Sequence, residues 1–255
     1  MRIQSADALI LRTYRYGEAD RIVVFLTQDR GKKRGVAKNA TKSRRRFGGA
    51  LEPLTRGKVA YVEREHRDLV RIDRIEAPRT SLKAAVGRTT ADAAHVLGHA
   101  SYFAELLDEW APEGQANERL FRLGAAIGEA LCRRGSVEAL ARYFEYWLLR
   151  LEGVYPSLDQ CARCLRPALD AGAVLAAGDW TYICVDCAGT DPELSASAIK
   201  FLRQVIAKTP ADITSVAASA KAVREVERVH QRLITVHLDK ELRSTRVVRE
   251  LRPQS

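Results

Sequence analysis

The chain has 255 residues and a formal net charge of +10 at pH 7, with 46% hydrophobic and 29% charged residues. This composition is close to that of an average globular protein, so it excludes wholesale disorder and allows one large domain or two to three small ones. The first seven residues lack the apolar core of a signal peptide, and no window approaches the roughly 20 apolar residues that span a bilayer. We therefore expect a cytoplasmic protein.

The excess positive charge lies in the first third of the chain. Residues 1–80 hold 20 Lys and Arg against 10 Asp and Glu, whereas residues 81–255 hold 22 of each. Nine basic residues fall between Arg30 and Arg46, and no acidic residue occurs between Asp29 and Glu52. Such a run displaces counterions from nucleic acid, so we expect a nucleic-acid surface here. A solvated loop and a surface for anionic lipid are the alternatives.

Short segments with strand character make up the same third of the chain. They lie at residues 8–14, 22–27, 31–37, 58–62 and 69–75. Five strands in about 80 residues fit an OB-type barrel, and an SH3-like barrel fits nearly as well. The second strand is apolar on both faces, so another part of the chain should cover it.

The basic stretch 38–49 has no apolar periodicity, and we expect it to be a loop or a frayed turn beside the barrel. Aromatic rings near such a loop can stack on unpaired bases, although a place in the barrel core is the simpler role for each of them. The candidate rings are Tyr14, Tyr16, Phe47 and Tyr61.

Amphipathic helices follow the strands. Residues 89–92 resemble a capping box, and the helix after them runs to Trp110. The next helix places its apolar residues between 120 and 131 on one face, and a third, with Ser136 as its N-cap, does so between 137 and 151. We expect these three helices to form a bundle.

Two further helices are predicted near the C-terminus. The first covers residues 194–207, and a break at Thr209 and Pro210 separates it from a long helix beginning near Ala222. An apolar stripe on the long helix should pack on the bundle. The tail from Leu242 is basic, and we expect it to be disordered or to make a second contact with phosphate.

Four cysteines form the strongest chemical motif. Cys161 and Cys164 make one CxxC pair, and Cys184 and Cys187 make another after nineteen intervening residues. Four thiolates close the tetrahedral coordination of one Zn²⁺ ion, so the site should be structural and hold a small β-ribbon between the pairs. An iron–sulfur cluster and redox dithiols are the alternatives. The fifth cysteine, Cys132, is expected to be an inert thiol.

Two weaker motifs carry no chemistry. His95 and His99 have the spacing of a zincin helix, but Val96 stands where the catalytic glutamate is needed. Residues 31–36 lack the Gly-Lys-Ser/Thr ending of a phosphate loop, and no nucleophile elbow occurs in the sequence. We therefore expect a protein that is not an enzyme.

Four segments resemble the RecO family of bacterial DNA repair proteins. They are residues 8–20 (ALILRTYRYGEAD), 34–38 (RGVAK), 47–53 (FGGALEP) and 155–161 (YPSLDQC). The order of a small barrel, a helical domain and a four-cysteine module also matches that family. Leu165 is a departure, because the family often has glycine after the first CxxC pair, and some members lack the cysteines.

The resemblance implies a non-enzymatic mediator of homologous recombination in the RecF pathway. Proteins of this family bind single- and double-stranded DNA, anneal complementary strands, act on DNA coated by single-stranded-DNA-binding protein (SSB), and work with RecR to help load RecA. We carry the DNA-binding role onto ten residues: Lys32, Lys33, Arg34, Lys38, Lys42, Arg44, Arg45 and Arg46, with Arg12 and Arg15 added to them.

The expected architecture is an α+β multidomain protein. An OB-fold domain should cover residues 1–80, the first part of a helical domain 81–155, a zinc module 156–192, and the C-terminal helices with a basic tail 193–255. Three other functional classes fit parts of the pattern: a zinc-stabilised RNA-binding protein, a transcriptional regulator, and a nuclease. RNA preference, sequence-specific duplex binding or metal-dependent substrate loss would identify them.

Overall fold

The structure is a computed structural model that describes residues 3–43, 45–63, 68–167 and 169–252. These residues form two compact units. The first unit contains the described residues up to Arg133 together with those from Leu242, and the second is Arg134–Glu241. Within the described ranges, no helix is long and apolar enough to cross a membrane.

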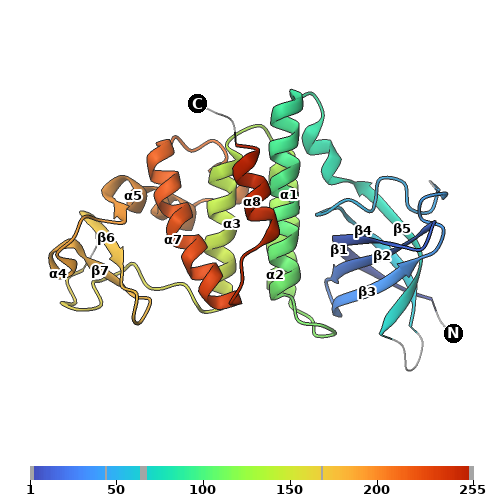
Figure 1. The fold of residues 1–255 in the computed structure, drawn as a ribbon, viewed down its shortest axis with the longest axis horizontal. Coiled ribbons are helices and arrows are strands. Elements are labelled where there is room, and N and C mark those ends of the chain that lie inside the picture. Colours follow the sequence, from blue (N-terminus) through green and yellow to red (C-terminus); the bar gives the residue numbers. More distant parts are fainter. Residues whose placement is uncertain (1–2, 44, 64–67, 168, 253–255) are drawn as a thin grey trace. The chain divides into compact units, whose positions relative to one another are not determined.

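A closed barrel of five strands forms the N-terminal part of the first unit (Figure 1). The strands are β1 (Gln4–Tyr16), β2 (Asp20–Thr27), β3 (Gly31–Ala37), β4 (Arg56–Val62) and β5 (Leu69–Arg79). They follow the order β1-β2-β3-β5-β4, and only the β3–β5 pairing is parallel. The predicted five-stranded barrel is therefore confirmed.

Helices α1 and α2 cover the outer face of the barrel beside β1. Val24 and Leu26 are both buried, which confirms that the second strand is covered on both sides. The close approach of α2 depends on Gly124, where a Cβ atom would lie 2.8 Å from Leu9 Cδ1 and 2.7 Å from Leu107 Cδ1. A side chain at this position would force these leucine side chains to shift.

Four helices complete the first unit: the 3₁₀ helix η1 (Ser81–Ala85), α1 (Thr90–Trp110), α2 (Glu118–Leu131) and α8 (Arg243–Glu250). The predicted cap of α1 is confirmed, since Thr89 Oγ1 accepts from the Asp92 backbone N–H at 3.2 Å. The basic tail is helical rather than disordered. Its first turn is held by Glu105 of α1, whose Oε2 accepts from the Ser244 backbone N–H at 2.8 Å.

The second unit combines helices with a small three-stranded sheet of order β7-β6-β8 (Figure 1). Its elements are α3 (Val137–Leu151), β6 (Gly172–Leu175), β7 (Tyr182–Cys184), α4 (Val185–Ala188), β8 (Leu194–Ser195), α5 (Ala196–Ala207), α6 (Pro210–Ile213) and α7 (Ala220–Leu238). Here α3 packs against α5, α6 and α7, whereas α1 and α2 belong to the unit of the barrel. The three helices expected in one bundle thus divide between the two units.

A chain of buried polar side chains joins the elements of the second unit. Arg142 Nη2 donates to Glu145 Oε1 at 2.6 Å, and Glu145 Oε2 lies 3.0 Å from His230 Nδ1. His230 Nε2 lies 3.1 Å from the Tyr155 hydroxyl, which also accepts from the Tyr182 hydroxyl at 3.2 Å. Burial lowers the pKa of His230, so a neutral ring donates to the carboxylate and accepts from the phenol. The chain connects α3 and α7 to β7.

Candidate nucleic-acid interface and metal centre

The basic segment between β3 and β4 is an ordered series of turns. We call residues 38–46 the basic turn. The Asn39 backbone N–H donates to Asp20 Oδ1 at 2.7 Å, and the Thr41 N–H donates to the Ala19 carbonyl at 3.2 Å. These bonds fasten the start of the turn to the β1–β2 hairpin. At the other end, Phe47 is only 1% exposed and fills the barrel core, so the segment is the loop that the sequence predicts, held at both ends rather than frayed.

Four predicted DNA-binding side chains point to solvent. Within the described ranges, none of them makes an ion pair or a side-chain hydrogen bond. We call them the open cations: Arg15 of β1 and Lys38, Lys42 and Arg45 of the basic turn. Unpaired surface cations can meet phosphate oxygens without first breaking an internal bond. Arg44, also predicted to bind DNA, lies outside the described residues.

Arg12 differs from the open cations because three carboxylates of α1 surround it. Its Nε lies 2.8 Å from Asp108 Oδ2, and its Nη2 lies 3.1 Å from Glu109 Oε1 and 3.4 Å from Glu105 Oε1. Burial lowers the pKa of Arg12, but contacts with Tyr14 and with the carboxylates outweigh this effect and raise it. The guanidinium of Arg12 is therefore already paired with acidic side chains of the same protein.

Two residues of β3 are paired in the same way. Lys32 Nζ donates to the Asp108 carbonyl at 2.5 Å and lies 3.3 Å from Asp108 Oδ1. Arg34 Nη2 lies 2.8 Å from Glu113 Oε1, although both side chains are more than half exposed. We call Arg12, Lys32 and Arg34 the paired cations. Their neighbours at the end of α1 neutralise part of the positive surface that the sequence predicts.

Lys33 and Arg46 are intermediate cases. Lys33 Nζ donates to Glu63 Oε1 at 2.7 Å, and this hydrogen bond lowers the pKa of Glu63. Arg46 Nε donates to the Asp73 carbonyl at 2.8 Å, and its guanidinium lies 4.7 Å from the centre of the Phe47 ring. Both side chains therefore support the local structure while keeping part of their surface in solvent.

The four candidate stacking rings separate into two pairs. Phe47 and Tyr61 are 1% and 0% exposed and belong to the barrel core. Tyr14 and Tyr16, on β1, are 46% and 50% exposed. Only the second pair can meet a base without unfolding the barrel.

Two exposed strand cations that make no ion pair with a described residue were not predicted from the sequence. Lys58 lies on β4, and Arg71 lies on β5 in register with Val36 of β3. The basic run alone gave no reason to select them, because each stands between uncharged strand residues. Their exposure follows from strand alternation, which places their side chains outside the barrel.

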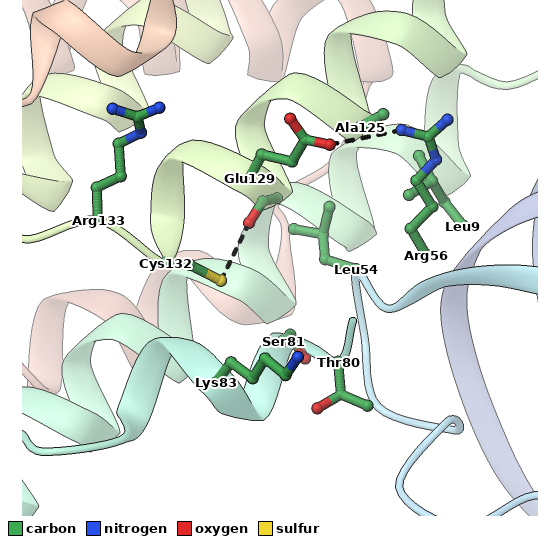
Figure 2. Close-up of a pocket in the computed structure, with 11 residues that line it drawn as sticks. Leu9, Leu54, Arg56, Thr80, Ser81, Lys83, Ala125, Glu129, Cys132 and Arg133 are labelled. Carbon is green, nitrogen blue, oxygen red and sulfur yellow. Dashed lines mark hydrogen bonds and ion pairs between the residues drawn. The ribbon is translucent and has the colours of Figure 1, made fainter. Parts of the chain in front are cut away.

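A separate cavity of about 340 Å³ lies between β4 and α2 (Figure 2). Arg56 Nη1 and Glu129 Oε1 form an ion pair across it at 3.6 Å. Cys132 lies at its edge, with Sγ 3.6 Å from the Gly128 carbonyl. Figure 2 shows Lys83 and Arg133 beside the same space. Among the described residues that line the cavity, no side chain is aromatic.

The four cysteines of the two CxxC pairs converge in the second unit. Their Sγ atoms all lie within 4.8 Å of one another, and the Sγ atoms of Cys164 and Cys184 are 3.8 Å apart. Sulfur atoms at about 2.3 Å from a tetrahedral Zn²⁺ ion are separated by about 3.8 Å, so the cluster fits one ion of this kind. The pairs come from a turn after α3 and from the junction of β7 with α4.

Backbone N–H groups point at the sulfur atoms. The Cys184 N–H donates to Cys161 Sγ at 3.3 Å. Desolvation raises the pKa of Cys161, but N–H groups of Cys164, Cys184 and Arg163 outweigh it and lower the pKa to about 6. This favours the thiolate that a metal ion requires.

A residue with a left-handed backbone conformation follows each cysteine pair. Leu165 follows the first pair at φ +59°, and Gly189 closes α4 after the second pair at φ +65°. A left-handed residue turns the chain sharply, and glycine adopts this conformation without strain. The position where this chain has leucine in place of the family's glycine is therefore a strained one.

Comparisons with known proteins agree over both units. A family model described as Recombination protein O N terminal matches residues 1–80, and one described as Recombination protein O C terminal matches residues 93–246. The DNA repair protein RecO of Anaeromyxobacter sp. (strain K) is 34% identical over 250 residues, covering 96% of this chain and 95% of the relative. That of Geobacter sulfurreducens is 34% identical over 97% and 98% of the two chains. That of Koribacter versatilis is 41% identical over 64% of each chain.

Proposed function

Because the chain belongs to the RecO family of DNA repair and recombination proteins, we propose that it is a non-enzymatic recombination mediator that binds DNA through its barrel. It holds single- and double-stranded DNA and anneals complementary strands. Annealing breaks no covalent bond: it requires a surface that screens the repulsion between two phosphate backbones and leaves the base edges accessible.

The observation that carries this proposal is the group of open cations beside the β1–β2 hairpin. Arg15, Lys38, Lys42 and Arg45 have no internal partner in the described part of the chain, so binding phosphate costs them no existing ion pair. The basic turn is fastened to the hairpin through Asn39 and Asp20, which keeps its charges in place before DNA arrives. Preorganised cations lose less conformational entropy on binding than those of a free loop.

We infer the biological partners from the same family membership. The protein acts on DNA coated by SSB and cooperates with RecR to help load RecA, in the cytoplasm where bacterial DNA lies. Arg12 and Lys32 take a smaller part in DNA binding than the sequence predicts, because acidic side chains of α1 already occupy them.

The four-cysteine cluster holds one structural Zn²⁺ ion in this proposal. Bound there, the ion supplies a cross-link between the two cysteine pairs. Two hydrogen bonds also link the segments that carry the two cysteine pairs. Arg163 Nη1 donates to the Cys187 carbonyl at 2.8 Å, and Arg166 Nη1 donates to Asp186 Oδ2 at 2.5 Å. Four cysteine ligands complete the coordination, so the site serves folding.

Annealing of two SSB-coated complementary oligonucleotides, followed by fluorescence, tests the function. We expect the protein to accelerate annealing and the triple variant Lys38→Ala, Lys42→Ala, Arg45→Ala to lose most of the acceleration. A matched control removes three exposed cations of the second unit, Lys200→Ala, Lys208→Ala and Lys221→Ala, and should keep it. No acceleration by the native chain at low salt, or tighter binding of RNA than of DNA of the same sequence, would contradict the proposal.

A further inference from the structure

A second cavity, of about 390 Å³, opens on the outer face of the barrel. Its walls come from four neighbouring strands: Tyr14 of β1, Ile22 and Val24 of β2, Arg34 of β3 and Leu69 of β5. These residues are cross-strand neighbours, since Tyr14 pairs with Ile22, Val24 with Arg34, and Arg34 with Leu69. They therefore form one continuous patch.

The chemistry of the lining is specific. Tyr14 offers an exposed ring, and Ile22, Val24 and Leu69 offer aliphatic surface. Polar edges come from Arg34 and from the ion pairs of Arg12 and Lys32 with Asp108 and Glu109 of α1. A volume near 390 Å³ is within the roughly 300–1,000 Å³ of small-molecule sites. A planar ligand with an apolar face and polar edges would fit, and a nucleobase has both of these properties.

The position of the cavity relates it to the open cations. Tyr14 precedes Arg15, one of those cations, and the β1–β2 hairpin that follows is bonded to the basic turn at Ala19. The β1–β2 hairpin therefore carries both a wall of the cavity and one of the open cations. The cavity of Figure 2 offers no comparable surface, because its described lining has no aromatic ring.

We propose that this cavity on the barrel receives one unstacked base of a bound single strand, with Tyr14 as the stacking surface. The inference rests on the proposed function and adds a source of selectivity to it. Bases within a duplex are paired and stacked on one another, so they cannot enter without being extruded. The cavity thus favours single strands, whereas the open cations bind either form of DNA.

Equilibrium binding of two oligonucleotides of equal length tests the inference. One is a thymidine strand, and the other has the same phosphates but abasic sugars. Stacking of one base on an aromatic ring corresponds to about a 5- to 150-fold change in affinity. We expect the native chain to prefer the thymidine strand by a factor in this range, and Tyr14→Ala to reduce the preference to near one.

Two further variants make the test specific. Tyr14→Phe keeps the ring and should keep the preference. Tyr16→Ala removes a ring of similar exposure on the same strand, outside the cavity lining, and should also keep it. Tyr14 is 46% exposed, so thermal unfolding should show Tyr14→Ala folded like the native chain.

The outcomes separate the inference from the proposed function. Binding of neither strand by the native chain would overturn the proposed function and the inference together. Equal binding of both strands by the native chain would overturn the inference alone, as would a preference that survives in Tyr14→Ala or disappears in Tyr16→Ala. A 2-aminopurine base in the strand gives a second readout, since its fluorescence should fall on binding to the native chain and remain high with Tyr14→Ala.

Discussion

The two compact units place their ionisable groups in opposite ways. The unit of the barrel has an apolar core and keeps Arg15, Lys38, Lys42 and Arg45 in solvent. The second unit brings polar groups together, in the four-cysteine cluster and in the buried chain of side chains from Arg142 to Tyr182. These open cations of the first unit are therefore available to a partner, whereas the buried polar groups of the second unit hold that unit together.

The largest effect that we expect is unfolding of the second unit while the first unit stays folded. Cys184→Ser, or removal of the metal by a chelator, should unfold residues 134–241 to a large extent, because structural zinc sites contribute about 10 kcal/mol or more in small peptides. Circular dichroism and limited proteolysis would detect the loss, while the affinity for single-stranded DNA should change little. Cys132→Ser, at an exposed cysteine outside the cluster, is the control and should have no effect.

That prediction also tests whether the metal is structural. If removing the metal abolished DNA binding while the second unit stayed folded, the cysteine cluster would belong to the interface instead. The conclusion that the cysteine cluster only stabilises the second unit would then be wrong.

The next effect comes from the buried polar chain. Glu145→Gln removes the carboxylate shared by Arg142 and His230 and should lower the free energy of unfolding by about 1–3 kcal/mol, because two buried groups lose a charged acceptor while Arg142 keeps its ion pair with Glu227. Denaturant titration measures this change. The matched control is Glu193→Gln, whose ion pair with Arg232 is partly exposed and should contribute less than about 1 kcal/mol. Equal costs for the two variants would contradict the structural role of the chain.

Within the first unit, a paired and an open arginine should respond differently. Arg12→Ala removes the guanidinium that three carboxylates of α1 share, although Asp108 keeps Lys32, and we expect it to lower stability by about 1–3 kcal/mol. Arg15→Ala should leave the unfolding temperature unchanged and weaken DNA binding. Thermal unfolding and DNA titration of both variants check this contrast, and a larger loss of affinity for Arg12→Ala than for Arg15→Ala would contradict it.

The smallest effect sharpens the description of the metal site. Leu165→Gly relieves a left-handed leucine, and after the entropy that glycine adds to the unfolded chain it should stabilise the second unit by ~0.5 kcal/mol. A precise denaturant titration of the metal-loaded protein would resolve the change. Destabilisation would mean that the exposed leucine makes contacts that outweigh its backbone strain.

Local patterns in the sequence predict the strands, the helix caps and the cysteine cluster. The five strands and the caps at Thr89 and Ser136 follow from alternation and from short-range hydrogen bonding, which act within a few residues. The cluster follows from the spacing of its cysteines, because two CxxC pairs restrict the geometry of their thiolates.

The pairing of the cations could not be predicted in this way. Arg12 and the acids of α1 are far apart in the sequence and meet only when the helix packs on the barrel. The exposure of Tyr14 depends on a β-bulge between Ile10 and Arg12, which moves the following residues of β1 to the opposite face. Strict alternation from Ile10 would place Tyr14 in the core. The cap of α8 by Glu105 is a tertiary contact of the same kind.

The salt dependence of single-stranded DNA affinity tests the central claim most directly. The native chain, the triple variant Lys38→Ala, Lys42→Ala, Arg45→Ala, and the control triple Lys200→Ala, Lys208→Ala, Lys221→Ala would be titrated over a range of salt concentrations. Each lost phosphate contact lowers the slope of log affinity against log salt by about 0.7, so the first triple should lower it by about 2 and the control should leave it unchanged. Equal slopes for all three proteins would show that the open cations of the barrel do not hold DNA.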